Sequence, residues 1–234
     1  MFLLLPFWVM LCLGVAQVVL VGAIWVLGHA GLSLAGLNPT TANTVVAVLV
    51  YMVTLVFVIG VPLWVRKNRT TRSTLGLNRL PSWMDIILAP AGFIVYGLAS
   101  AIVSYAAMKL IPGFDATQAQ NIGFSNLSHS YEYVLAFATL VVLAPLAEEV
   151  LFRGYLYGKL KNHLPIWAAV LVTSAAFGLA HGQWNVGIDV FVLSIVLCCL
   201  REVTGNIWAG VLLHMLKNGV AFYFLFINTS LLMH

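Results

Sequence analysis

The feature that most constrains this chain is the absence of charge from residues 1–65, since the first Asp, Glu, Lys or Arg is Arg66. Across all 234 residues, 62% are hydrophobic and 8% are charged, whereas about 25% are charged in an ordinary soluble domain. Such a chain cannot cover a water-facing surface, which excludes a soluble enzyme, a disordered chain and a nucleic-acid-binding module. The remaining class is an all-α polytopic protein of the lipid bilayer.

The apolar runs predict the membrane-spanning helices, because a span needs about 20 mostly apolar residues. We expect seven of them, at about residues 3–28, 44–65, 84–110, 132–158, 165–181, 185–201 and 206–228. A re-entrant turn at 182–187 would change the count, so six to eight remain open. The first run has no basic residue before it and is too long for a secretory signal, so we expect a retained span.

The basic residues predict the orientation in the membrane. Five of the eleven lie in one short loop between the second and third spans, namely Arg66, Lys67, Arg69, Arg72 and Arg79. By the positive-inside rule, the loop 66–80 is expected in the cytoplasm. The N-terminus then lies on the same side, and with seven spans the C-terminus lies outside.

Ionisable residues gather in the last four apolar runs, where each is costly to insert and is therefore a candidate for function. Glu149 and Arg153 are four residues apart, which favours an ion pair on one helix face. Glu148 points about 100° away from Glu149 and is expected to face another helix. The simpler alternative is that both glutamates bracket Arg153 in a packing network, but this leaves one buried negative charge unexplained.

Three further polar residues lie at similar membrane depth in later runs: His181, His214 and Asn218. A lone histidine in a helix is more often a satisfied core residue than a functional one. Together with Glu148, however, the three can meet in the middle third of the membrane. One carboxylate, two imidazoles and one amide can activate water, bind a metal ion or do both.

These residues form three ordered motifs, which are Glu148-Glu149-x-x-x-Arg153, Phe177-x-x-x-His181 and His214-x-x-x-Asn218. In this order, on separate helices, they resemble the CPBP intramembrane proteases. That family includes the type II CaaX prenyl endopeptidases and bacterial bacteriocin-processing and immunity proteins. The similarity covers about residues 66–220. We therefore divide the chain into two N-terminal helices without family motifs, 1–65, and a protease-like domain, 66–234.

The resemblance implies an intramembrane endopeptidase of the bacterial cytoplasmic membrane that cleaves a membrane-associated peptide or protein. It implies that Glu148 and His181 act on water, that His214 and Asn218 complete the site, and that Glu149, Arg153 and Phe177 support it. Asp189 and Lys217 are charges that the family pattern does not predict.

Two questions stay open on the sequence. The first question is whether a metal ion takes part. A metalloprotease would hold zinc with Glu148, His181 and His214. A metal-independent glutamate enzyme, which we favour slightly, would use Glu148 as a general base and Asn218 as an oxyanion donor.

The second question is the function itself, for which there are two alternatives, a non-proteolytic scaffold or immunity protein and a proton-coupled transporter. A transporter more often strings polar residues along several helices and shows an internal repeat, neither of which is seen here.

Overall fold

The structure is a computed structural model that describes residues 4–31, 36–67, 69–116, 118, 123–124 and 127–228. These residues are mostly helical, and no strand occurs among them. The all-α prediction is therefore confirmed. Each of the seven apolar runs coincides with a helical segment, with ends that differ from the predicted ones by a few residues.

The first three segments are α1 (Leu5–His29), α2 (Pro39–Leu55) and α5 (Trp83–Leu110). The second segment continues from α2 through a π-helical stretch, Val56–Gly60, into α3 (Val61–Arg66), and the short α4 (Arg72–Leu75) lies in the basic loop. The fourth segment is one long helix made of α6 (Ser130–Phe137), a π stretch (Ala138–Leu143), α7 (Ala144–Glu148), a second π stretch (Glu149–Tyr157) and α8 (Gly158–Leu160). The last three are α9 (Ile166–Ala180), α10 (Trp184–Thr204) and α11 (Trp208–Phe222), which ends in a π stretch, Tyr223–Ile227.

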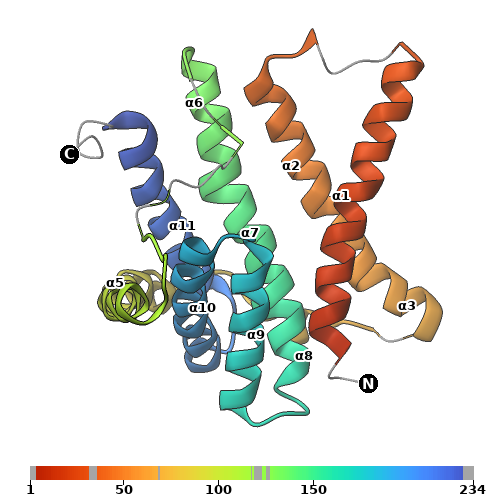
Figure 1. Cartoon of the computed structure of the whole chain (residues 1–234). Helices are drawn as coiled ribbons and strands as arrows, with labels where there is room; N and C mark the ends of the chain where they lie inside the picture. Colours follow the sequence, from red (N-terminus) through yellow and green to blue (C-terminus); the bar gives the residue numbers. More distant parts are fainter. Residues whose placement is uncertain are drawn as a thin grey trace.

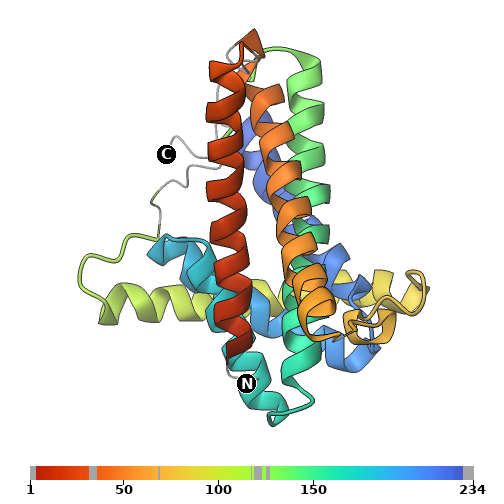
Figure 2. The same cartoon turned by 90° about the vertical axis from the view of Figure 1, so that its right-hand side faces the viewer.

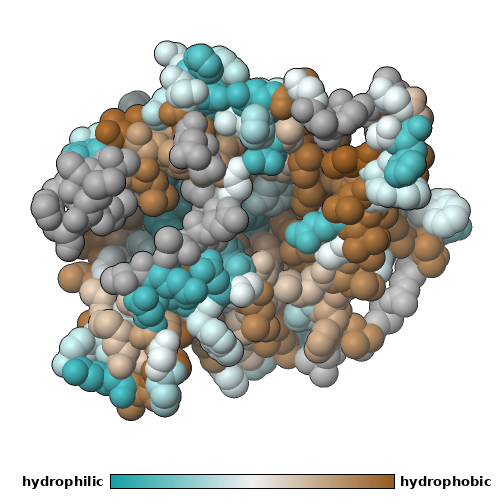
Figure 3. Space-filling view, turned by 45° about the horizontal axis from the view of Figure 1, so that its top comes forward, coloured by the Kyte–Doolittle hydropathy of each residue, from teal (hydrophilic) through white to brown (hydrophobic). Residues whose placement is uncertain are grey.

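Five segments of the described chain are long and apolar enough to cross a membrane: Leu5–His29, Pro39–Val65, Trp83–Leu110, Ser130–Leu160 and Trp208–Ile227. The α9 helix is apolar but shorter, with 15 residues. Their large apolar side chains are widely exposed, as a lipid-facing surface requires. Figure 3 shows such hydrophobic side chains gathered over the side of the molecule formed by α1 and α2.

Local sequence signals set several helix ends. The Asn38 side chain accepts hydrogen bonds from the backbone N–H groups of Thr40 and Thr41, and Pro39 occupies the first turn, so this helix has both a favourable N-cap and a favourable first residue. Ser82 and Asp85 form a capping box at the start of α5. Gly205 ends α10 in the left-handed conformation, with φ of 67°, which glycine adopts without a steric penalty.

The helices are not all parallel. The α1 and α2 helices and the long helix from α6 to α8 run along the vertical direction of both views, whereas α5 is seen end-on in Figure 1 and lies across Figure 2. The α10 and α11 helices pack on α5, around buried Leu193, Leu197 and Leu213. The polar motifs therefore lie where the upright and crosswise helices meet.

The N-terminal helices share a hydrophobic core with the helices that carry the motifs. Val9 and Cys12 of α1 and Val58 after α2 belong to the same buried cluster as Leu151 and Phe152. The domain boundary at residue 65 stays a prediction, since it is drawn from where the similarity to the family begins. In the fold, residues 4–31 and 36–65 pack directly against the helices that carry the motifs.

Candidate active site

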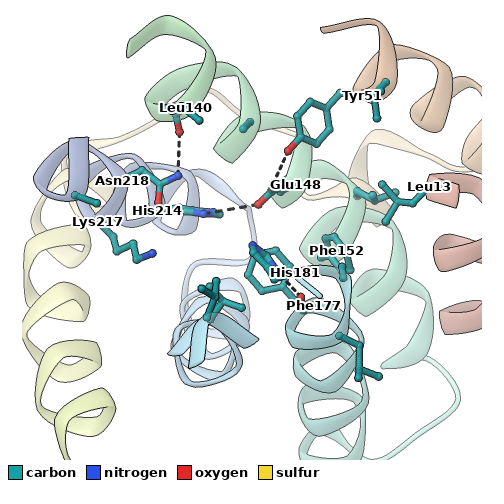
Figure 4. A pocket seen from close by; sticks show the side chains of 18 of the residues that line it. Leu13, Tyr51, Leu140, Glu148, Phe152, Phe177, His181, His214, Lys217 and Asn218 are labelled. Atoms are coloured by element: carbon teal, nitrogen blue, oxygen red, sulfur yellow. Dashed lines mark hydrogen bonds and ion pairs between the residues drawn. The ribbon is translucent and has the colours of Figure 1, made fainter. Parts of the chain in front are cut away.

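A cavity of about 730 Å³ lies between the upright helices and α9 to α11. Its lining includes all four residues predicted to carry the chemistry: Glu148, His181, His214 and Asn218. They come from α7, the end of α9 and α11 (Figure 4). The remaining lining is largely apolar, so these few polar groups lie in a setting of low dielectric, where electrostatic interactions are strong.

Glu148 is held between two other helices. Its Oε1 accepts a hydrogen bond of 2.5 Å from the hydroxyl of Tyr51 on α2. Its Oε2 lies 3.8 Å from Nε2 of His214 on α11. The side chain retains 15% of its accessible surface, so the carboxylate is fixed in position yet open to the cavity, facing other helices as its helix position predicts.

Glu149 and Arg153 form the predicted ion pair, with 2.8 Å between Oε1 and Nη1 and both side chains fully buried. The same Glu149 oxygen lies 3.2 Å from Nδ1 of His214. The Arg153 guanidinium is 4.3 Å from the centre of the Phe177 ring, a cation–π distance. The pair therefore neutralises charge and fixes the His214 ring at the same time.

His181 follows the last residue of α9, where the helix ends. Its Nδ1 lies 2.9 Å from the carbonyl oxygen of Phe177, and since a carbonyl only accepts, Nδ1 must carry the proton. In this tautomer of a neutral ring, Nε2 carries the lone pair. The Phe177 ring packs edge-on against both histidines, at centroid distances of 4.8 Å to His181 and 5.9 Å to His214.

Asn218 is oriented by a backbone carbonyl. Its Nδ2 donates a 2.9 Å hydrogen bond to the carbonyl oxygen of Leu140, which lies in the π stretch Ala138–Leu143. A π-helical turn shifts the backbone hydrogen-bond register, and such turns are frequent at functional sites. A second π stretch begins at Glu149, directly after Glu148. The helix that supplies the carboxylate thus departs from α geometry on both sides of it.

A family model described as "Type II CAAX prenyl endopeptidase Rce1-like" matches residues 130–220. This segment, which is less than half of the chain, is similar to that family. It contains all three motifs and the four cavity residues that the sequence singles out, and it confirms the resemblance drawn from those motifs.

Two curated bacterial proteins are similar to the chain. An uncharacterized 24.3 kDa protein of Escherichia coli is 32% identical over 89 residues, which are 36% of this chain and 41% of that protein. The uncharacterized protein YpbD of Bacillus subtilis is 29% identical over 126 residues, 53% of this chain and 65% of that protein. Each match thus spans less than two thirds of the relative. No solved structure matches the chain.

The zinc alternative requires the candidate active site to bring three ligands to one point. Among the residues that the structure describes, no group of three or more His, Cys, Asp or Glu side chains is placed to hold a metal ion. Glu148, His181 and His214 line one cavity but do not form such a group. The zinc hypothesis therefore stays a prediction for a metal analysis.

Asp189 and Lys217, the two charges outside the family pattern, lie together beside the candidate active site. Lys217 Nζ is 3.6 Å from Asp189 Oδ2, and Asp189 also accepts hydrogen bonds from the hydroxyls of Tyr96 and Ser100 on α5. The pair links α5, α10 and α11. Their charges are thus explained by mutual neutralisation, and Lys217 also lines the cavity.

Sequence reasoning missed Tyr51. The motif comparison treats residues 1–65 as free of family features, so no pattern directs attention to α2. The one available signal is that Tyr51 is the only ionisable side chain in the run 44–65. An isolated phenol in hydrocarbon needs a hydrogen-bond partner, and here that partner is Glu148.

Proposed function

We propose that this protein is an intramembrane endopeptidase, which uses Glu148 to activate water and hydrolyse a peptide bond of a membrane-associated peptide or protein. The observation that carries the proposal is the Glu148 carboxylate in a largely apolar cavity, with Tyr51 at one oxygen and His214 near the other. The Rce1-like segment, which contains all three motifs, supports the same reaction class.

In the proposed mechanism Glu148 acts as the general base. It takes a proton from a water molecule whose oxygen attacks the peptide carbonyl carbon, and the proton later passes to the leaving amine. His181 keeps its Nδ1 proton on the Phe177 carbonyl, so its Nε2 lone pair can accept a hydrogen bond from the same water and orient it.

The negative oxygen of the tetrahedral intermediate needs hydrogen-bond donors placed in advance. Asn218 has two amide protons, one of which is used on Leu140, and the other can donate into the cavity. The Nδ1 atom of His214 faces the Glu149 carboxylate and donates its proton there. When Nε2 also carries a proton, the ring can donate a second hydrogen bond into the cavity. Glu149 and Arg153 act here as positioning residues through His214.

We favour the metal-independent version of this mechanism. Bound zinc would supply a Lewis acid that polarises the carbonyl and acidifies water, and its candidate ligands would be Glu148, His181 and His214. The support for the metal-independent version is the donor set, since the Asn218 amide lines the cavity and is a poor zinc ligand but a good donor to an oxyanion. We also place the protein in the cytoplasmic membrane of a bacterium, with the loop 66–80 in the cytoplasm, and the two bacterial relatives support this setting.

The test compares membrane-protein termini in cells that express the wild type, Glu148→Gln or Glu202→Gln. Glu202 is a matched control because it is also a helical glutamate in a polar contact, paired with Lys161 at 2.6 Å but absent from the cavity lining. We expect new peptide termini with the wild type and with Glu202→Gln, and their loss with Glu148→Gln at equal protein level. Termini that persist in the Glu148→Gln cells would contradict the proposal.

A further inference from the structure

A second groove, of about 1010 Å³, lies away from the candidate active site. It is formed where the beginning of α1, the α3 helix, the α4 loop and the end of the long helix at α8 come together, in the lower part of Figure 1. It shares no lining residue with the cavity that contains Glu148.

The walls of this groove are apolar and open to the bilayer side of the molecule. Leu4, directly before α1, and Phe7 and Leu11, near its start, line one wall, and Val61 and Val65 line the other from α3. All five side chains are exposed, and Phe7 keeps 71% of its accessible surface. Because they belong to faces of helices that are long and apolar enough to span the membrane, an occupant that enters from the bilayer meets a hydrocarbon-like surface.

The polar end of the groove is basic. Arg69 and Lys159 line it, and no Asp or Glu does. The ion pairs of the described chain include neither residue, whereas the neighbouring Lys161 is neutralised by Glu202 at 2.6 Å. The Lys159 ammonium instead packs 4.7 Å from the centre of the Tyr155 ring. Two positive charges are thus held at the rim of an apolar groove without a carboxylate.

This combination selects one kind of occupant. Acyl chains suit the exposed apolar wall, and a negatively charged phosphate suits the Arg69 and Lys159 rim, since basic pockets between membrane helices bind anionic headgroups. The rim lies at the end of the molecule that carries the basic loop, which the charge rule predicts to be cytoplasmic. We infer that this groove is a binding site for an anionic phospholipid of the cytoplasmic leaflet. The inference does not rest on the proposed protease activity.

The test measures lipid binding to the purified full-length protein by native mass spectrometry. The probes are phosphatidylglycerol, phosphatidylcholine with the same acyl chains, and glycerol 3-phosphate, which carries the phosphate without the chains. Each basic residue near a membrane surface adds roughly a fivefold preference for anionic lipid, so two of them predict about 30-fold tighter binding of phosphatidylglycerol than of phosphatidylcholine. Glycerol 3-phosphate should bind far more weakly than either lipid.

Two matched variants locate the site. Arg69→Gln/Lys159→Gln should lose most of the 30-fold preference, whereas Arg72→Gln/Lys109→Gln removes the same charge outside the groove and should keep it. Equal binding of the two lipids to the wild type would overturn the inference even if the groove variant failed to fold. A preference that survives in the groove variant, or glycerol 3-phosphate binding as tightly as the lipid, would overturn it as well.

Discussion

The buried ion pair between Glu149 and Arg153 makes a quantitative prediction about stability. Arg153→Met removes the partner of a fully buried carboxylate and leaves Glu149 with the His214 ring as its remaining polar contact. Breaking a buried pair by removing one partner destabilises a protein by about 3–5 kcal/mol. The lost packing of the guanidinium on Phe177, at 4.3 Å, acts in the same direction.

Two further variants separate this effect from general damage to the core. Glu149→Gln/Arg153→Met removes both charges and keeps an acceptor for His214, so we expect it to recover about 2 kcal/mol or more of the loss, since neutral replacement of a buried pair is often tolerated. Lys161→Met breaks the Lys161–Glu202 pair, whose side chains are each 28% exposed, and should cost no more than about 1 kcal/mol.

Denaturant unfolding in detergent micelles, followed by circular dichroism, measures all three variants against the wild type. We expect a large loss of stability for Arg153→Met, a partial recovery in the double variant and a small loss for Lys161→Met. Equal losses for Arg153→Met and Lys161→Met, or a double variant as unstable as Arg153→Met, would refute it.

Three other predictions address the chemistry and the topology. Tyr51→Phe removes a hydrogen bond to the Glu148 carboxylate, and hydrogen bonds to charged groups contribute about 1.5–3 kcal/mol. We therefore expect kcat/KM to fall by about 10- to 150-fold at unchanged folded yield. An unchanged kcat/KM would show that Tyr51 does not position Glu148. In a cysteine-free background, cysteine in place of Arg72 should be labelled only from the cytoplasm and cysteine in place of Leu37, which lies between α1 and α2, only from the other side, and labelling of both from one side would overturn the predicted orientation. Elemental analysis of active protein should find less than one zinc per chain, and one tight zinc that is lost together with activity in His214→Ala would establish the metalloprotease instead.

The helices could be predicted because membrane insertion leaves a strong local signal. An apolar run of about 20 residues is legible without tertiary information, and Asn38-Pro39 or Gly205 mark helix ends through their own backbone chemistry. The Glu149–Arg153 pair was also predictable, since four residues in a helix bring side chains together even where, as here, the turn widens to π geometry.

The rest depends on contacts between helices. Hydropathy is the same for an upright and a crosswise helix, so the orientation of α5 could not be predicted from its 28 residues. The π stretches are set by packing and by bonds such as that from Asn218 to the Leu140 carbonyl, which join residues distant in the sequence. Tyr51 lies 97 residues before Glu148, and only the folded chain brings the two together.

Peptide hydrolysis by the purified protein in lipid nanodiscs is the most direct test of the role proposed for Glu148. Wild type, Glu148→Gln and the control Glu202→Gln are incubated with a library of apolar peptides, and new termini are identified by mass spectrometry. We expect cleavage by the wild type and by Glu202→Gln, and none above background by Glu148→Gln at equal folded yield. Cleavage by Glu148→Gln at the wild-type rate would contradict the central claim that Glu148 activates the attacking water.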